Sequence, residues 1–399
     1  MRIEHWPQQL QAAVPVLERI NQAGFEVYFV GGCVRDTLLR RPLHDVDLAT
    51  SAYPQEIKQI FPQTIDTGIE HGTVTVIYQK KAYEITTFRT ESGYQDYRRP
   101  DKVEFVRSLK EDLKRRDFTI NALAMNAQGE IIDLFAGIAD LQQRQIRAVG
   151  VAADRFHEDA LRMLRAVRFQ AQLNFTIEKQ TLAGIKTNAA LLSHIATERI
   201  REEFIKLMEG CNRQAGLISL YQTQLYRFCP GLATYDFPKI LQFAAGQITD
   251  EATVWSFLAY LGQLKRAQVR PFLRQWKVAN NNIKLAQAAI ELLNNYQESN
   301  WQLYIAGQAA TAIAAQVLRL TCQQELAEQL IEQYQDLPLK SPQQLAINGQ
   351  QIMQVLNLSP GPQIGQYLKQ IQQAIVAGQL VNDYPTIVNY LKNNNLSDR

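Results

Sequence analysis

Two aspartates, Asp45 and Asp47, are separated by one residue in an apolar segment and could bind a metal ion together. The pattern of residues 45–49 predicts a strand, on which alternate side chains point to the same face. Two carboxylates on one face repel each other unless they share a cation, and hard oxygen ligands suit Mg²⁺. The alternative is a solvated strand edge, which is the commoner meaning of an isolated Asp-x-Asp pattern.

Glycines and arginines elsewhere in the first 120 residues could hold phosphate groups. Gly31 and Gly32 follow a predicted strand at residues 25–30 and precede a short predicted helix. Backbone N–H groups are open at such a turn, where phosphates commonly bind. Arg115 and Arg116 add guanidinium groups, whose geometry suits triphosphate oxygens and the charge that develops in phosphoryl transfer. A plain turn at the glycines and a basic surface turn at the arginines are the alternatives.

Residues 158–169 predict a single helix whose polar face could recognise a nucleobase. Asp159, Arg162 and Arg165 are spaced by three, which places them on adjoining parts of one surface. A carboxylate beside a guanidinium offers a hydrogen-bond acceptor next to donors. Cytosine and adenine present an amino donor beside a ring-nitrogen acceptor, whereas uracil and guanine present the reverse, so this pair would select C and A. The alternative is a solvated face on which Asp159 pairs with Arg162.

The elements that must position these residues form a small α/β head followed by helices. The polar segment 89–102, with Gly93 and Pro100, predicts a mobile loop beside the site, and a plain surface connection is the alternative. From residue 155 onward helical periodicity dominates, and the last third is rich in Gln and Ala, which favour helices. Strands are expected at 25–30, 45–49, 73–79 and 82–88, and helices of the head at 8–23 and 54–61.

Composition excludes several classes of protein. The chain has 399 residues, 46% of them apolar, and a formal net charge of +3, so basic residues act through local clusters. Four cysteines without C-x-x-C spacing predict reduced thiols in a cytoplasmic protein. All five histidines lie in the first half, which excludes a histidine-based phosphohydrolase from the second half. No signal-peptide pattern and no apolar run of about 18 residues is present, so no membrane partner is expected.

Six motifs occur in order between about residues 25 and 205. They are Gly31-Gly32 with Arg35-Asp36, Asp45-x-Asp47, Arg115-Arg116-Asp117-Phe118-Thr119, Asp133-x-x-x-Gly137-x-x-Asp140-Leu141, Glu158-Asp159-x-x-Arg162 and Glu198-Arg199-x-x-x-Glu203. This order resembles the class II tRNA nucleotidyltransferases, the bacterial CCA-adding enzymes of the polymerase β-like nucleotidyltransferase superfamily. The chain length and the histidine-free second half resemble the short, Firmicutes-type members.

The resemblance implies an α+β fold, with a polymerase β-like head on a mixed or antiparallel sheet and an elongated all-helical neck, body and tail. The implied catalytic head covers residues 1–145, and the neck that recognises the nucleotide covers residues 146–210. The body covers residues 211–300, and the tail that binds tRNA covers residues 301–399. The implied reaction is template-independent addition and repair of the 3′-terminal CCA of tRNA from CTP and ATP, with release of pyrophosphate and with Mg²⁺ as the metal.

The motifs also imply roles for single residues. Asp45 and Asp47 match the catalytic metal ligands, while Asp159 and Arg162 match the base-reading pair. Segment 89–102 is implied to reshape the pocket for ATP. The family positions that make further contacts to the nucleotide are matched by Gly32, Arg35, Arg116, Arg165 and Arg168.

Three more carboxylates have an expected role in or near the site. Glu198 and Glu203 match a motif that braces the base-reading helix. Glu84, on a strand expected beside the metal ligands, is a candidate third catalytic carboxylate.

Rival functions remain open at this point. One is a specialist of the same family that adds only CC, only A, or poly(A). Segment 89–102 argues against CC-only enzymes, which lack it, and the modest charge argues against poly(A) synthesis. A rival of another class is a catalytically silent nucleotide sensor or RNA-binding protein, against which Asp45 and Asp47 argue. The oligomeric state is also open, and a homodimer is one of the assemblies considered.

Overall fold

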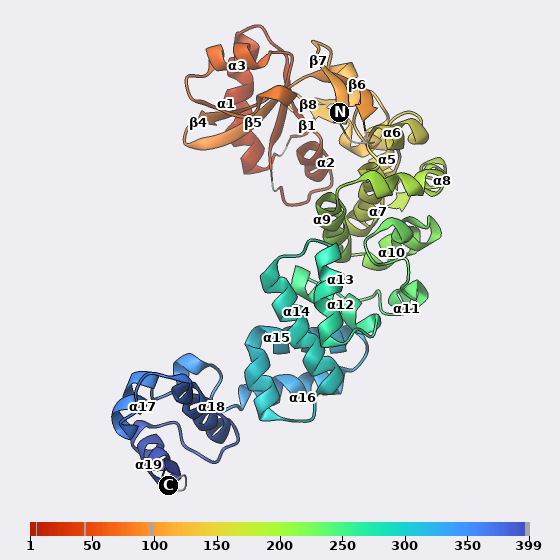
Figure 1. Cartoon of the computed structure of the whole chain (residues 1–399). Helices are drawn as coiled ribbons and strands as arrows, with labels where there is room; N and C mark the ends of the chain where they lie inside the picture. The colour runs from red at the N-terminus through yellow and green to blue at the C-terminus, as the bar shows by residue number, and fades with distance from the viewer. Residues whose placement is uncertain (5, 44, 96–98, 396–399) are drawn as a thin grey trace. The chain divides into compact units, whose positions relative to one another are not determined.

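The protein is described by a computed structural model that covers residues 1–4, 6–43, 45–95 and 99–395. It divides into two compact units, Met1–Thr234 and Tyr235–Arg399, and each is described by itself (Figure 1). Among the residues covered, no helix is both long enough and apolar enough to cross a membrane.

A seven-stranded sheet with strand order β3-β4-β5-β2-β1-β8-β9 forms the centre of the first unit. Its β2–β5 pair is parallel, while the other neighbouring strands are antiparallel, so the expected mixed sheet is confirmed. Buried residues such as Phe29 and Val76 fill its core. The strands are β1 (Val27–Val30), β2 (Asp47–Thr50), β3 (Thr64–Gly68), β4 (Thr73–Tyr78), β5 (Lys81–Thr87), β8 (Leu123–Met125) and β9 (Ile131–Asp133).

In the described part of the head, five α-helices accompany this sheet. In α1 the buried residues Leu10, Ala13, Leu17 and Ile20 recur every three or four positions, as an amphipathic helix requires. The hydroxyl of Tyr83 on β5 donates to the carbonyl oxygen of Ala12 and fastens α1 to the sheet. The helices are α1 (Gln8–Gln22), α2 (Gly32–Leu38), α3 (Pro54–Ile60), α4 (Leu109–Lys114) and α5 (Gly137–Gln142).

The segment predicted to be a loop at 89–102 contains two paired strands, and that prediction is wrong. Strands β6 (Arg89–Gln95) and β7 (Arg99–Phe105) pair antiparallel as a two-stranded sheet of their own. Gly93 and Pro100 suggest strand breakers, but both strands of an isolated pair are edge strands, where proline is tolerated. Pro100 pairs in register with Tyr94.

Helices follow the head within the same unit. The segment predicted as one helix at 158–169 is interrupted, because α6 ends at Glu158 and α7 begins at Leu161, so that prediction is wrong as well. Two short strands, β10 (Gln145–Ile146) and β11 (Thr176–Ile177), pair in parallel beside them. The helices are α6 (Ala152–Glu158), α7 (Leu161–Leu173), α8 (Lys179–Asn188), α9 (Thr197–Met208) and α10 (Arg213–Gln222).

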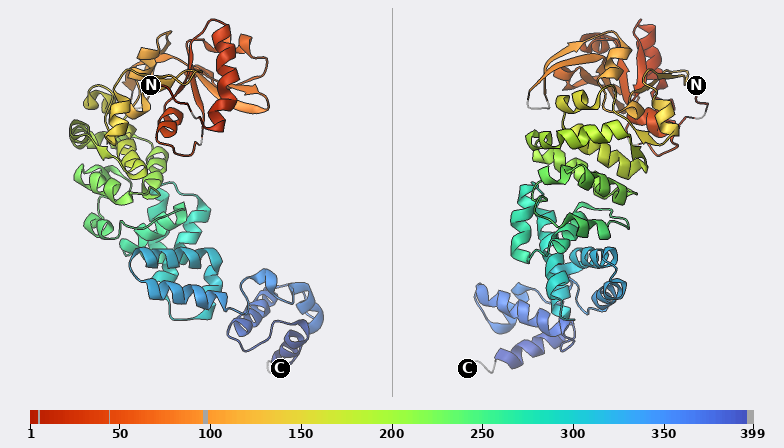
Figure 2. Two further views of the ribbon diagram at one scale, coloured as in Figure 1. Left: turned by 180° about the vertical axis from the view of Figure 1, so that it is seen from behind. Right: turned by 90° about the vertical axis from the view of Figure 1, so that its right-hand side faces the viewer.

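The second unit has helices but no strand in its described residues, as expected. Helices α12, α14, α15 and α16 lie side by side (Figure 2). One apolar core contains residues from both sides of the expected boundary at residue 300, for example Ala289 and Leu318. The helices are α11 (Phe237–Gln242), α12 (Glu251–Leu261), α13 (Arg266–Gln275), α14 (Asn280–Asn295), α15 (Asn300–Leu320), α16 (Gln324–Gln335), α17 (Gly349–Leu356), α18 (Pro362–Val376) and α19 (Tyr384–Asn395).

Candidate active site

Asp45 and Asp47 lie at the exposed start of β2. Asp47 is the first residue of that strand, and the three residues after it are buried in the sheet. Although Asp47 is at the surface, neighbouring atoms keep part of its carboxylate from water, and this desolvation raises its pKa. The charges of Asp45 and Glu84 raise the pKa further, and the charge of Arg116 opposes them. Three carboxylates therefore influence one another at this end of β2, and a divalent cation would relieve their repulsion.

Glu84 is in register with Asp47 on the neighbouring strand β5. In the described part of the chain, no three His, Cys, Asp or Glu side chains are grouped so that they could hold one metal ion. Asp45 and Asp47 both line the cleft described below, whereas Glu84 does not. Asp45 and Asp47 therefore fit as two carboxylate ligands of a hard divalent cation.

The glycine turn before α2 makes room for an arginine. Gly31 has φ 70°, a conformation that favours glycine, and a Cβ atom there would lie 2.8 Å from Nη1 of Arg116. Arg35, on α2, pairs with Asp36 at 2.8 Å and donates from Nη1 to Oδ1 of Asn121 at 2.7 Å. Arg116 also donates from Nη1 to the backbone carbonyl oxygen of Asn121 at 3.5 Å, so Asn121 accepts from both arginines.

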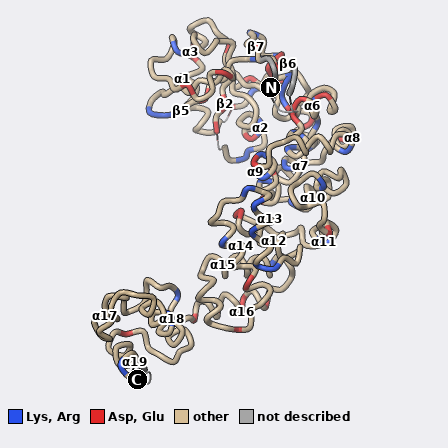
Figure 3. Tube along the Cα trace, in the orientation of Figure 1, with Lys and Arg blue, Asp and Glu red and all other residues tan. Residues whose placement is uncertain are grey.

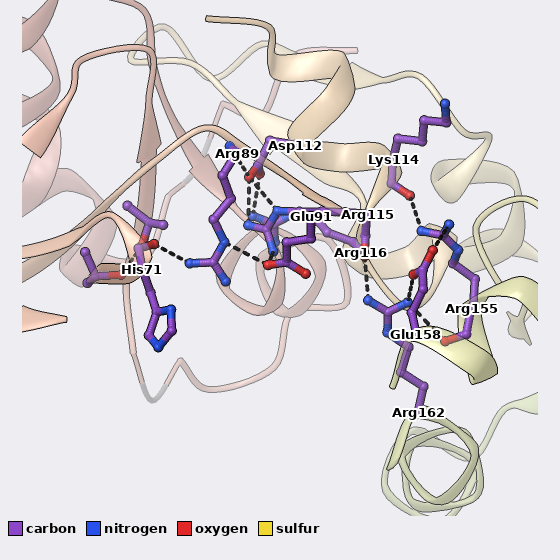
Figure 4. Close-up of polar contacts among 12 residues, drawn as sticks. His71, Arg89, Glu91, Asp112, Lys114, Arg115, Arg116, Arg155, Glu158 and Arg162 are labelled. Carbon is purple, nitrogen blue, oxygen red and sulfur yellow. Dashed lines mark hydrogen bonds and ion pairs between the residues drawn. The ribbon is translucent and has the colours of Figure 1, made fainter. Parts of the chain in front are cut away.

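A buried carboxylate holds Arg115 and Arg116 in place (Figure 4). Asp112, on α4, is 1% exposed and accepts from Arg115 at 2.7 Å and from Arg116 at 3.2 Å. Burial alone would raise the pKa of Asp112, but the two arginines hold it below its ordinary value. Arg115 also pairs with Glu91 of β6 at 3.2 Å, so the hairpin and the arginine pair share one ionic network.

Asp159 lies in the break between α6 and α7, with extended backbone angles of φ −141° and ψ 104°. Its Oδ1 accepts from the backbone N–H of Leu161, and its Oδ2 lies 2.7 Å from Nη2 of Arg199 on α9. These contacts explain the break, because an Asp side chain that bonds the backbone two residues ahead competes with helical hydrogen bonds. Arg199 was not predicted as a site residue, although the motif Glu198-Arg199 contains it.

Arg162 is held by different neighbours from those of Asp159. Its Nη1 donates to Glu158 and to the carbonyl oxygen of Arg155, and its Nη2 donates to the carbonyl oxygen of Arg115 at 2.8 Å (Figure 4). Within the described residues these bonds use three of the five guanidinium N–H groups. Among the described residues, the side chains of Asp159 and Arg162 are therefore held by separate partners and are not paired with each other.

Arg165 and Arg168 continue along α7 and contact two buried carboxylates. Arg165 Nε donates to Asp117 at 2.8 Å, and the arginine charge together with hydrogen bonds holds the pKa of Asp117 well below its usual range despite burial. Arg168 Nε lies 3.0 Å from Glu203 on α9, an ion pair without the alignment of a hydrogen bond. Burial lowers the pKa of Arg168 to about 10. Glu203 thus braces α7, as the resemblance implied.

One cleft of about 990 Å³ brings these elements together. Nine of the residues that the sequence predicted for the site line it, although they come from four separate stretches of the first unit, and the candidate carboxylate Glu84 lies outside it. The predicted residues that line the cleft are Gly32, Arg35, Asp45, Asp47, Arg116, Asp159, Arg162, Arg165 and Arg168. Residues that were not predicted also line it, among them Asn121, Phe169, Arg199 and Lys206.

Three arginine side chains of the cleft lie close to the ring of Phe169. The guanidinium carbons of Arg168, Arg35 and Arg165 lie 4.0, 5.0 and 5.3 Å from the centre of its ring. A ring face attracts cations, so Phe169 keeps three arginines close together despite their like charge. The arrangement offers carboxylates at one part of a cleft and clustered guanidinium groups at another, which suits an anionic substrate that carries a metal ion.

Family models match three parts of the chain. Residues 27–147 match the poly A polymerase head domain, and residues 174–235 match the probable RNA and SrmB-binding site of polymerase A. Residues 246–391 match tRNA nucleotidyltransferase domain 2.

Relatives of known activity cover almost the whole chain. The CCA-adding enzymes of Lactobacillus delbrueckii subsp. bulgaricus and Latilactobacillus sakei subsp. sakei are each 51% identical to it, over 95% and 96% of this chain and 96% and 98% of their own. The crystal structure of the Bacillus stearothermophilus CCA-adding enzyme in complex with CTP has a TM-score of 0.83 and 38% identity, and covers 98% of this chain and 99% of its own. With its motifs, fold and cleft in agreement, this chain belongs to the CCA-adding enzymes, the class II tRNA nucleotidyltransferases.

Proposed function

We propose that this protein adds and repairs the 3′-terminal CCA of tRNA from CTP and ATP, without a nucleic-acid template. The observation that carries the proposal is the single cleft that joins Asp45 and Asp47 to the polar face of α7. The 3′-hydroxyl oxygen of the tRNA forms a bond to the α-phosphorus of the nucleotide, the bond from that phosphorus to the β-phosphate oxygen breaks, and pyrophosphate leaves with the hydroxyl proton released to solvent. The cytoplasm, where reduced thiols persist, is the proposed location.

Asp45 and Asp47 would hold the metal, and we propose Mg²⁺ because hard carboxylate oxygens suit it. When bound, Mg²⁺ supplies positive charge beside the reacting phosphate and the leaving pyrophosphate. Arg35 and Arg116 would bind the triphosphate oxygens. Both are held by neighbours in the free protein, so little reorganisation accompanies binding.

The choice of base is assigned to Asp159 and Arg162. Asp159 accepts a hydrogen bond from the amino group of cytosine or adenine, and it repels the carbonyl oxygen of uracil or guanine. Arg162 donates to N3 of cytosine or N1 of adenine with the N–H groups that its anchors leave available. Arg165 and Arg168 lie further along α7 and add contacts to the nucleotide. Side chains thus do what a template base does in other polymerases.

The test uses tRNA transcripts that lack A, CA or all of CCA, each incubated with one labelled nucleotide at a time. We expect CTP to extend the transcripts that end before either C, ATP to extend only the transcript that ends in CC, and UTP and GTP to be rejected. Repeated A addition would indicate a poly(A) polymerase, and failure of either C or A addition would indicate a partial specialist. No incorporation at all would indicate a silent binding protein.

A further inference from the structure

A run of positive charge lies on α13, in the second unit, far along the chain from the cleft. Residues 264–279 contain five basic residues and no acidic one. In Figure 3, blue segments mark basic residues at α13 (Arg266–Gln275). The five are Lys265, Arg266, Arg270, Arg274 and Lys277.

Three of these cations form a stripe on one side of the helix. Arg266, Arg270 and Arg274 are spaced by four, which places neighbours about 6 Å apart along the axis. Val269 and Leu273 lie between them in sequence and are buried, so the two sets occupy different faces. Arg266 and Arg274 are exposed, and Arg270 is half-buried. The packing of α13 therefore keeps the stripe at the surface.

These side chains are not committed to structural ion pairs. In the described part of the chain, neither Lys265 nor any arginine of the stripe lies within 4.0 Å of a carboxylate. Arg107 of the first unit, by contrast, pairs with Glu56 at 2.9 Å. A row of surface cations without neutralising partners repels itself, and binding of an anion with several charges would relieve that repulsion.

The stripe begins at a cleft of about 790 Å³ within the second unit. Lys239, Lys265 and Arg266 line this cleft, and Glu291 is the one acidic residue among the described residues that line it. Phe243 and Tyr260 line it as well. The positive surface thus extends from α13 onto the loop before it and onto α11. A surface of this length is larger than the binding site of a small anion would need to be.

The expected tRNA-binding tail has the opposite balance of charge. Residues 301–399 carry five basic and six acidic residues, so their formal net charge is −1 (5 − 6). On α16, Glu325, Glu328 and Glu332 recur every three or four positions (Figure 3). Such a face repels phosphates.

We infer that α13, with Lys239 and Lys265 beside it, is the surface of the second unit that binds the phosphate backbone of tRNA. The inference rests on the proposed function and names where in this unit the substrate is held. Contacts of this kind position the RNA without reading its sequence, which suits an enzyme that must accept tRNAs of every sequence. The tail would then contribute to tRNA binding through its shape and packing more than through its charge.

The test compares two full-length variants with the same reduction in charge. One carries Arg266→Gln, Arg270→Gln and Arg274→Gln on α13, and the control carries Lys340→Gln, Lys369→Gln and Lys392→Gln in the tail. Binding of a tRNA transcript that lacks CCA is measured by fluorescence anisotropy over a series of salt concentrations. Removal of one cation that neutralises a phosphate should reduce the slope of log K against log salt by about 0.9.

We expect the α13 variant to reduce that slope by about two to three and to bind the transcript at least about tenfold more weakly at ~0.1 M salt, while KM for CTP stays unchanged. The tail control should change the slope by less than about one. Equal effects of the two variants, or no effect of the α13 substitutions, would overturn the inference. Because Arg270 is half-buried, Lys265→Gln with Arg266→Gln serves as a second variant should the triple variant unfold. Extension of the transcript by the unaltered enzyme tests the proposed function separately.

Discussion

Arg162 donates a hydrogen bond through Nη2 to the backbone carbonyl oxygen of Arg115 at 2.8 Å, and this bond links the N-terminal end of α7 to the chain after α4. The side chain of Arg115 in turn contacts Asp112 and Glu91. One residue therefore connects the hairpin β6–β7, the buried carboxylate that holds Arg116, and the arginine assigned to the base. The positions of these groups depend on one another.

Substitution of Arg115 by alanine should affect both stability and nucleotide binding. Asp112 would keep Arg116 as its remaining arginine partner in a buried place, so we expect a decrease of about 1–3 kcal/mol in the free energy of unfolding, measured by denaturant titration. KM for CTP and ATP should rise, because Arg116 would be drawn toward Asp112. Lys58→Ala, which removes an exposed ion pair with Asp66, should cost less than about 1 kcal/mol and leave KM unchanged. An Arg115→Ala enzyme with unaltered KM would show that this network does not position the site.

Gly31→Ala should weaken nucleotide binding by displacing Arg116. The added Cβ would lie 2.8 Å from Nη1 of Arg116, and the positive φ of Gly31 adds backbone strain. Gly24→Ala is the matched control, because Gly24 has φ 89° but nothing within 4 Å of the added atom. Both variants should melt at lower temperature, and only Gly31→Ala should raise KM for CTP and ATP. A comparable rise in KM for both would mean that the strain, and not the contact with Arg116, is responsible.

Asp45→Ala and Asp47→Ala should each abolish addition of C and of A while tRNA binding stays nearly intact. The reason is the proposed role of both carboxylates in binding Mg²⁺, which neither can perform alone. Incorporation of labelled nucleotide and tRNA affinity are measured on the same preparations. Asp66→Ala, at an exposed position on β3, should leave incorporation unchanged. Retention of a tenth of the unaltered activity by either Asp45→Ala or Asp47→Ala would refute the metal assignment.

Nine residues of the cleft were predictable from sequence because their chemistry is carried by short, ordered motifs. The prediction of Asp45 and Asp47 needed only the alternation of side chains along a strand. The prediction of the turn at Gly31 needed only its place directly after a strand. The break at Asp159 was not predictable from spacing alone, because one oxygen of its carboxylate bonds the backbone of Leu161 while the other is held by Arg199, which lies on another helix 40 residues later. The hairpin at β6–β7 was missed because its pairing is made by backbone hydrogen bonds, which polar side chains do not reveal. Arg199, Asn121 and Phe169 act through tertiary contacts that one-dimensional spacing cannot indicate.

Asp159→Ala tests the central claim, that side chains of this cleft choose the nucleotide. The comparison is kcat/KM for all four nucleoside triphosphates, on one tRNA that ends in CC and on one that lacks CCA. Removal of the acceptor should reduce selectivity for CTP over UTP by about 5- to 150-fold, equivalent to about 1–3 kcal/mol. Arg165→Ala is the control, because it should weaken binding of CTP and ATP without admitting UTP.

The measurement that decides the matter is the ratio of kcat/KM for CTP to that for UTP in the Asp159→Ala enzyme, relative to the unaltered enzyme. The proposed role of Asp159 predicts that this ratio falls, and that the ratio of ATP to GTP on the transcript ending in CC falls with it. If both ratios stay at their original values while overall activity drops, Asp159 is a structural partner of Arg199 and does not read the base.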